Sequence, residues 1–146
     1  LLRQLPLPMR LLLEGVVTAT EAQELSAHRG RVGFGLPLVS RIKNLVIANA
    51  PSAAVTDESY AVIEQKIDGH QWHYDTGDKG HMPWCKYSCS VLLTNDFEGG
   101  LFQFDDPFEE YKHYLSALIY SSDQLHRVTP HRGVRKALLI FLGERK

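Results

Sequence analysis

The sequence has no long apolar run and no excess of charge of either sign. None of its apolar stretches approaches the roughly 20 residues that a membrane-spanning helix requires, so we expect no membrane partner. Its 16 Lys and Arg residues nearly balance its 17 Asp and Glu residues, which leaves a formal net charge of −1. This balance gives no clear electrostatic signal for nucleic acid as a partner.

Cysteine is also scarce, because Cys85 and Cys89 are the only two in the chain. If the segment between them is a strand, their Cα atoms lie about 13 Å apart at roughly 3.3 Å per residue, too far for a disulfide. We therefore expect two free thiols, which suit a reducing compartment. The apolar start of the chain is interrupted by Pro6 and Pro8 and does not resemble a signal peptide. A cytoplasmic protein, trimmed at its N-terminus, is the expectation.

The chain has the length of one domain and contains no internal repeat, low-complexity tract or flexible linker. Its first part predicts a strand within residues 9–17. A helix over residues 18–30 should follow, with Ser/Thr capping candidates at its start and Gly30 at its end. Apolar residues spaced three and four apart predict a second helix within residues 37–51.

From Ser59 the sequence changes to short runs rich in β-branched and aromatic residues, separated by Gly, Asp, Asn and Pro. Such runs at regular spacing predict an antiparallel sandwich or barrel rather than alternating βαβ units. The sequence therefore predicts an α+β, mainly β fold in a single domain (1–146), with a helical lead-in (1–58) packed on a β-roll core (59–146). Strands are expected within residues 59–67, 86–94, 99–104, 113–121, 126–130 and 134–143.

His73 and Asp75 form the only His-x-Asp pair in the chain. Residues two apart on a strand point to the same face, so this imidazole and this carboxylate would converge on one cation. His70 lies three positions before His73 and would point the other way on an extended chain, so we expect it not to be a ligand. The pair alone is equally consistent with a surface turn, since one such match is unsurprising in a chain with seven histidines.

The C-terminal segment supplies a third candidate ligand and a permanent positive charge. The Pro-His-Arg-Gly sequence at 130–133 predicts a turn between two strands. With a two-residue loop, His126 would face Arg135 across a hairpin, at about 5 Å between Cβ atoms, and a longer loop would shift this register slightly. Two histidines and one carboxylate on one face of a metal suit Fe(II) oxygen chemistry, and a guanidinium beside them suits a dicarboxylate cosubstrate.

Three segments together resemble the Fe(II)- and 2-oxoglutarate-dependent oxygenases, and most of all their prolyl-4-hydroxylase-like branch. They are the His-x-Asp pair at His73 and Asp75, "LLTNDFEGGLFQF" at Leu92 to Phe104, and "LHRVTPHRGVRKALLIFL" at Leu125 to Leu142. The resemblance covers about residues 59–143. The ordered combination of these segments is specific.

This resemblance implies a double-stranded β-helix (jelly roll) in which His73, Asp75 and His126 bind Fe(II) and Arg135 pairs with the C5 carboxylate of 2-oxoglutarate. The implied activity is that of a dioxygenase that uses O2 and 2-oxoglutarate to hydroxylate a C–H bond, with ascorbate as a reductant. Its substrate would be a prolyl or other side chain of a peptide or protein, or a small molecule. The alternative is a non-catalytic β-roll that binds a metal or a small acid as a sensor module.

The sequence departs from the family where tyrosines help to hold the cosubstrate. Ten residues before His73, where many relatives have a tyrosine, the chain has Ile63, and Tyr60 is displaced from that position. A second tyrosine of some relatives falls near Leu92. The residues that could substitute, and that strand parity alone does not separate, are Tyr87, Ser88 and Ser90. His81, in a Gly-flanked loop, is a further candidate for a substrate contact.

Overall fold

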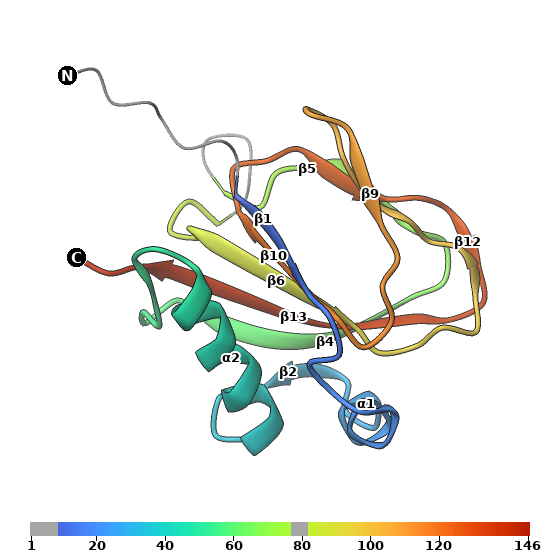
Figure 1. The fold of residues 1–146 in the computed structure, drawn as a ribbon, viewed down its shortest axis with the longest axis horizontal. Coiled ribbons are helices and arrows are strands. Elements are labelled where there is room, and N and C mark those ends of the chain that lie inside the picture. Colours follow the sequence, from blue (N-terminus) through green and yellow to red (C-terminus); the bar gives the residue numbers. More distant parts are fainter. Residues whose placement is uncertain (1–8, 77–81) are drawn as a thin grey trace.

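The computed structural model describes residues 9–76 and 82–146, which form two facing antiparallel sheets and two helices (Figure 1). The strands of the larger sheet are β1 (Arg10–Leu13), β2 (Gly30–Val32), β3 (Ala53–Ala54), β4 (Tyr60–Lys66), β6 (Tyr87–Leu92), β10 (Ala117–Ser121) and β13 (Arg135–Glu144). The smaller sheet contains β5 (His70–His73), β8 (Phe102–Phe104), β9 (Glu109–Tyr111) and β11 (His126–Val128). A third, two-stranded sheet pairs β7 (Glu98–Gly99) with β12 (His131–Arg132). His81 lies outside the described residues.

The order of the strands confirms the predicted mainly β jelly roll. The larger sheet runs β1-β10-β6-β13-β4-β2, with β3 paired to the end of β13, and the smaller sheet runs β5-β11-β8-β9. From β4 onward the chain alternates between the two sheets, in the order β4, β5, β6, the β8-β9 hairpin, β10, β11 and β13, which is the connectivity of a double-stranded β-helix. The residues before Ser59 contribute β1, β2 and β3 as well as the two helices.

Two helices cover the face of the larger sheet that points away from the smaller sheet (Figure 1). Helix α1 (Ala19–Ser26) begins with a capping box, in which the Thr18 hydroxyl accepts from the backbone N–H of Glu21 and the Glu21 carboxylate accepts from the backbone N–H of Thr18. It ends before the predicted Gly30, which has a φ of 76° and instead begins β2. Helix α2 (Pro37–Asn49) starts at a proline. Neither helix is long and apolar enough to cross a membrane, among the residues described.

The larger sheet has two chemically different faces because successive side chains of a strand point to opposite sides. On β13, Leu138 and Ile140 are fully buried in the core that the helices cover. The alternate residues Arg135, Leu139 and Phe141 point toward the smaller sheet. The helix-side face is therefore an apolar core, whereas the face between the sheets carries polar residues, such as Ser88, Ser90 and Arg135, as well as apolar ones.

The predicted hairpin between His126 and Arg135 is wrong. Strand β11 pairs with β5 and β8 in the smaller sheet, whereas β13 pairs with β4 and β6 in the larger sheet. The Pro-His-Arg-Gly segment carries the chain from one sheet to the other, with Gly133 at a φ of 89°. The turn residues at 130–133 therefore mark a crossing between the two sheets rather than a hairpin. His126 points into the space between the sheets from the smaller sheet, and Arg135 points into it from the larger sheet.

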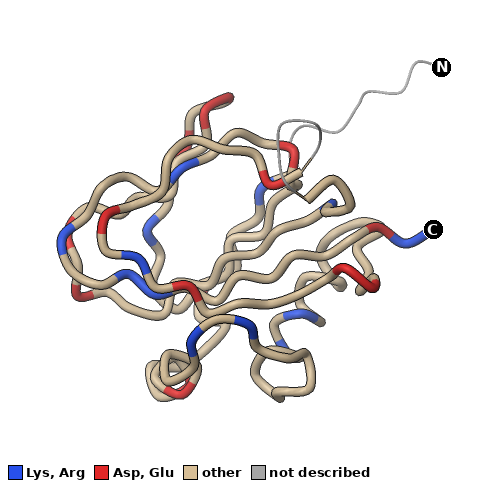
Figure 2. The backbone as a smooth tube through the Cα atoms, turned by 180° about the vertical axis from the view of Figure 1, so that it is seen from behind, with Lys and Arg blue, Asp and Glu red and all other residues tan. Residues whose placement is uncertain are grey.

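Charged residues of both signs are interspersed along the described chain (Figure 2). Ion pairs between distant segments include Arg10 with Glu109, at 2.9 Å, Arg41 with Glu21, at 2.8 Å, and Lys86 with Glu144, at 3.8 Å. This distribution agrees with the near-zero net charge.

Both cysteines are free, as predicted, and both are buried, although Cys85 lies just before β6 and only Cys89 lies on it. Burial raises the pKa of the Cys85 thiol to about 11 and that of the Cys89 thiol to about 12. Because the thiolate is the reactive form, a raised pKa slows alkylation at every pH below it.

We therefore expect iodoacetamide at pH 8 to leave both thiols unmodified in the folded protein, over a period in which it modifies both after denaturation. At that pH only about one Cys85 thiol in a thousand is ionised. Intact-protein mass spectrometry counts the added groups. Rapid double labelling of the folded protein would contradict the buried placement of the two thiols.

Candidate metal centre and cavity

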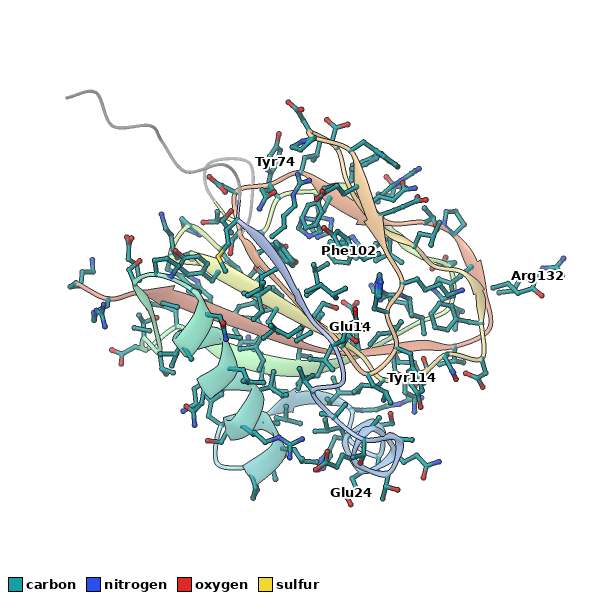
Figure 3. All side chains as sticks on the ribbon, in the orientation of Figure 1. Glu14, Glu24, Tyr74, Phe102, Tyr114 and Arg132 are labelled. Atoms are coloured by element: carbon teal, nitrogen blue, oxygen red, sulfur yellow. The ribbon has the colours of Figure 1, made fainter. Side chains whose placement is uncertain are left out.

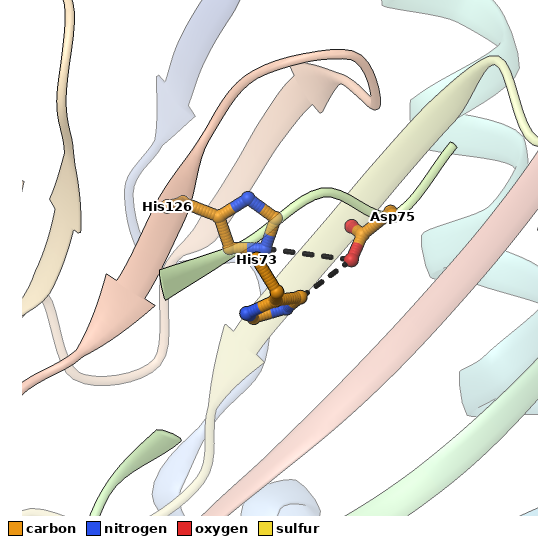
Figure 4. Close-up of side chains that lie close together, drawn as sticks. All are labelled: His73, Asp75 and His126. Atoms are coloured by element: carbon orange, nitrogen blue, oxygen red, sulfur yellow. Dashed lines mark ion pairs between the residues drawn. The ribbon is translucent and has the colours of Figure 1, made fainter. Parts of the chain in front are cut away.

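Three side chains that could hold a metal converge at one end of the space between the sheets (Figure 4). His73 ends β5, Asp75 follows it by two residues, and His126 begins β11 directly opposite His73. Nε2 of His73 and Nε2 of His126 each lie 3.4 Å from Oδ1 of Asp75. One ligand atom from each residue lies within 4.8 Å of the other two. Strand pairing thus brings together residues far apart in the sequence.

Backbone carbonyls fix the tautomer of both imidazoles. Nδ1 of His73 lies 2.7 Å from the Gln71 carbonyl oxygen, and Nδ1 of His126 lies 2.8 Å from that of Gln124. A carbonyl oxygen only accepts, so each Nδ1 carries the proton and each Nε2 directs a lone pair toward Asp75. In the neutral imidazoles these lone pairs face the carboxylate at 3.4 Å, an arrangement that is stabilised when a proton or a metal cation lies between them. The donor set therefore fits a divalent metal ion.

Asp75 is 3% exposed, and each of its oxygens has partners. Oδ1 faces the two imidazoles, and Oδ2 accepts hydrogen bonds from the hydroxyls of Ser88, at 2.8 Å, and Tyr120, at 3.1 Å. Burial favours the neutral acid, but hydrogen bonds from His126 and His73, when a proton is on Nε2, and from Ser88 outweigh it and hold the pKa of Asp75 well below its usual range. The carboxylate is therefore ionised at neutral pH, as a metal ligand must be.

The expectation that His70 points away from the site is wrong. Its ring centroid lies 4.0 Å from that of His73, and it lines the same cavity. The pairing of β5 with β11 is irregular, because His70 to His73 spans three residues while Val128 to His126 spans two. This β-bulge turns His70 toward the side of His73. Within the described residues, His70 does not belong to the cluster of ligand atoms.

The candidate ligands line a cavity of about 160 Å³ between the two sheets, and Arg135 lies in the same wall. Arg135 is 5% exposed, and its Nε donates to the Gly100 carbonyl oxygen at 3.2 Å. Burial lowers the pKa of Arg135, against the opposing effect of nearby Glu64, but a guanidinium remains charged at neutral pH. Its terminal nitrogens make no hydrogen bond to the described residues. They remain as donors for an anion in the cavity.

Phe102 fixes the plane of the His126 ring from inside the cavity. The two rings are stacked, with centroids 5.2 Å apart and planes 7° apart. Phe102 lies between the two sheets, whereas Arg132 points away from the protein (Figure 3). The remaining apolar residues of the cavity wall are Tyr60, Val62, Met82, Val128, Leu139 and Phe141.

Ile63, which stands where many relatives have the first cosubstrate-binding tyrosine, does not line the cavity. Ile63 is 3% exposed and packs in the core under the helices. Tyr60, three residues earlier on β4, does line the cavity, and its hydroxyl donates to the Met82 sulfur at 3.2 Å.

The structure distinguishes Tyr87, Ser88 and Ser90, the three residues that could replace the missing tyrosines. Ser88 binds Asp75, and Ser90 lines the cavity together with Arg135. The hydroxyl of Tyr87 donates to the Pro51 carbonyl, away from the cavity. Ser90 is therefore the one of the three that could contact a ligand bound to Arg135.

Sequence reasoning missed Tyr120, which is buried on β10 and reaches the candidate ligands. Its hydroxyl lies 3.1 Å from Asp75 Oδ2 and 3.4 Å from His126 Nε2. Burial and the Asp75 carboxylate raise the pKa of this phenol well above its usual value, so it is a hydrogen-bond donor. Tyr120 pairs with Ser88 across the sheet. The sequence shows that Tyr120 lies on a strand but not which residue lies opposite.

Solved structures of similar fold include prolyl hydroxylases and a protein of the 2-oxoglutarate–Fe(II) oxygenase family. A viral collagen prolyl hydroxylase from Paramecium Bursaria Chlorella virus-1, in complex with 2-oxoglutarate, has a TM-score of 0.74 at 14% identity, covering 94% of this chain and 96% of that chain. A prolyl-4-hydroxylase from Pseudomonas putida has a TM-score of 0.74 at 13% identity, covering 93% and 85%. A prolyl hydroxylase from Trichoplax adhaerens, in complex with a hypoxia inducible factor peptide, has a TM-score of 0.69 at 12% identity, covering 92% and 83%.

No protein-family model matches the sequence, and no curated protein is significantly similar to it. The similarity to the solved structures therefore concerns the arrangement of the backbone, and it extends over more than nine-tenths of the chain. The chain has the fold of the prolyl-hydroxylase-like branch of the Fe(II)- and 2-oxoglutarate-dependent oxygenases.

Proposed function

We propose that this chain is an Fe(II)- and 2-oxoglutarate-dependent dioxygenase that hydroxylates a C–H bond. The observation that carries the proposal is a cavity whose wall holds groups of opposite charge. One end has two imidazole lone pairs and an ionised carboxylate, and the wall also holds a buried guanidinium with free terminal donors. A cavity of this kind suits a metal ion and an anion bound side by side.

His73, Asp75 and His126 are the proposed Fe(II) ligands, through Nε2, Oδ1 and Nε2. Two histidines and one carboxylate leave further coordination positions open, which is typical of non-haem iron oxygenases. When bound, the iron and 2-oxoglutarate supply the oxidising power, because decarboxylation of 2-oxoglutarate to succinate is coupled to hydroxylation of the substrate by O2. The protein places the reactants and limits access of water.

Arg135 is the proposed partner of the C5 carboxylate of 2-oxoglutarate. A guanidinium can bind a carboxylate through two parallel hydrogen bonds, and its burial strengthens that interaction. Ser90 lies on β6 directly opposite Leu139 of β13, and both line the cavity. Leu139 would contact the methylene carbons of the cosubstrate, and the Ser90 hydroxyl would take the supporting role that a tyrosine has in relatives.

A peptide side chain, such as a prolyl residue, is the proposed substrate class. Its support is the fold shared with prolyl hydroxylases, one of them in complex with a peptide. Aromatic residues of the cavity wall agree with an apolar substrate group, since Tyr60 and Phe141 lie against each other with ring centroids 5.1 Å apart.

The purified full chain, loaded anaerobically with Fe(II), should form succinate from 2-oxoglutarate when O2 and ascorbate are added. Chromatography of the products measures succinate, and omission of Fe(II) is the control. A screen of peptides and small molecules should identify compounds that increase this turnover. If folded, iron-loaded protein forms no succinate, a non-catalytic metal-binding module is the better description.

Replacing His126 by Ala should abolish retention of Fe(II) while the fold persists, because it removes one of the three ligand atoms that converge at this site. Metal analysis after gel filtration measures the bound iron, and circular dichroism verifies the fold. His28→Ala is the matched control, since His28 is exposed and follows α1. Unchanged iron content in His126→Ala would remove this residue from the ligand set.

Replacing Arg135 by Ala should raise the KM for 2-oxoglutarate by roughly 10- to 100-fold, the equivalent of one lost hydrogen-bonded charge, and change Fe(II) affinity much less. Arg132→Ala is the control, because Arg132 points into solvent only three residues away (Figure 3). Equal effects of Arg135→Ala on iron and on cosubstrate would argue against the proposed role.

A further inference from the structure

A buried row of hydroxyl and thiol groups ends on the Asp75 oxygen that does not face the imidazoles. The Cys85 sulfur lies 3.1 Å from the Ser122 hydroxyl, which lies 2.9 Å from the Ser88 hydroxyl, which lies 2.8 Å from Asp75 Oδ2. Ser88 and Ser122 have no exposed surface, and Cys85 is 3% exposed. Water therefore does not compete for these hydrogen bonds.

The direction of every hydrogen bond in this row follows from the carboxylate. Ionised Asp75 only accepts, so Ser88 donates its one proton to Oδ2. The Ser88 oxygen must then accept from Ser122, which leaves Ser122 with no proton for Cys85. The contact between Cys85 and Ser122 therefore has the thiol as donor, which agrees with a Cys85 pKa of about 11. The Cys85 sulfur lies farther from the Tyr87 carbonyl oxygen, at 3.6 Å, and from the Ser88 hydroxyl, at 3.8 Å.

Tyr120 is a second donor to the same oxygen, from the neighbouring strand β10. Asp75 Oδ2 thus accepts hydrogen bonds from two hydroxyls, while Oδ1 alone faces the two Nε2 atoms. A carboxylate can bind a metal through one oxygen or through both. With both hydroxyls in place, binding through Oδ2 would require breaking two buried hydrogen bonds.

We propose that Ser88 and Tyr120 are positioning residues that keep Asp75 a one-oxygen metal ligand, and that Ser122 and Cys85 set the direction of the Ser88 hydroxyl. The inference rests on the metal site of the proposed function. Its consequence is that the second carboxylate oxygen cannot take a coordination position that the cosubstrate needs. The hydroxyls act on the metal only through Asp75.

Co(II) binding to the full chain, without 2-oxoglutarate, tests the proposal by visible absorption. Ser88→Ala and Tyr120→Phe should each weaken Co(II) binding about 10- to 100-fold, as loss of a partner of a metal ligand commonly does. The double variant should also change the Co(II) absorption spectrum, since Oδ2 becomes free to bind. Circular dichroism confirms folding, and Tyr120→Phe, which conserves shape, keeps the test valid if Ser88→Ala does not fold.

Two matched controls remove similar groups from the opposite face of the same strand. Tyr87→Phe deletes a tyrosine hydroxyl that binds the Pro51 carbonyl, and Cys89→Ala deletes a buried thiol in the helix-side core. Both should leave the Co(II) dissociation constant and spectrum unchanged. Equal weakening by these controls would mean that general loosening of the fold, and not Asp75, carries the effect, and would overturn the proposal.

The row itself is tested by combining variants. Ser122→Ala should weaken Co(II) binding about 3- to 10-fold in the parent chain, the value of one buried hydrogen bond, and should have no further effect in Ser88→Ala. Cys85→Ala should resemble Ser122→Ala, whereas Cys85→Ser, which keeps a donor, should bind normally. If the losses of Co(II) affinity from Ser88→Ala and Ser122→Ala add in the double variant, Ser122 does not act through Ser88, and the proposed order of hydrogen bonds is wrong.

The outcome does not depend on oxygenase activity. If the parent chain binds Co(II) but forms no succinate, the catalytic proposal fails while the positioning test still reports on Asp75. If Co(II) binds equally to the parent, Ser88→Ala and Tyr120→Phe, the positioning role is wrong whatever the activity.

Discussion

The interior of this protein is organised around one buried, ionised carboxylate. An isolated charge in an apolar interior is strongly unfavourable, so Asp75 requires partners on both of its oxygens. The smaller sheet provides His73 and His126 for one oxygen, and the larger sheet provides Ser88 and Tyr120 for the other. Asp75 therefore links the two sheets at one end of the cavity. The same contacts that make its burial tolerable also aim three ligand atoms at a common point.

Arg135 is the complementary constraint in the same cavity. It is as buried as Asp75, but its only hydrogen bond to the described residues is from Nε to Gly100, and Glu64 influences it at longer range. The terminal nitrogens of this guanidinium face the cavity without a hydrogen bond to the described residues, which favours binding of an anion there. The proposed cation site near Asp75 and the proposed anion site at Arg135 would each be completed by a ligand. A metal ion together with a dicarboxylate would satisfy both ends at once.

The sequence was sufficient for features that depend on local patterns. Strand segments, the two helices and the convergence of His73 with Asp75 follow from side-chain periodicity and capping, which act over a few residues. The meeting of His126 with Arg135 in one cavity was expected from a hairpin that does not exist. Its actual cause is non-local, since β11 and β13 belong to different sheets that face each other. Turn residues indicate that the chain changes direction, and they do not indicate which strand it pairs with next.

The residues that sequence analysis placed wrongly or missed depend on register. A single bulge in β5 reverses the side to which His70 points, and no residue type in "HQWH" marks that bulge. Serines on β6 are a stronger signal, because Ser88 and Ser90 occupy the inward face of a strand that is buried throughout. Small polar side chains at such positions forgo apolar packing and imply a hydrogen-bonding partner inside. Only the pairing of β6 with β10 and β13 determines which serine reaches the carboxylate and which lies beside the cavity's apolar wall.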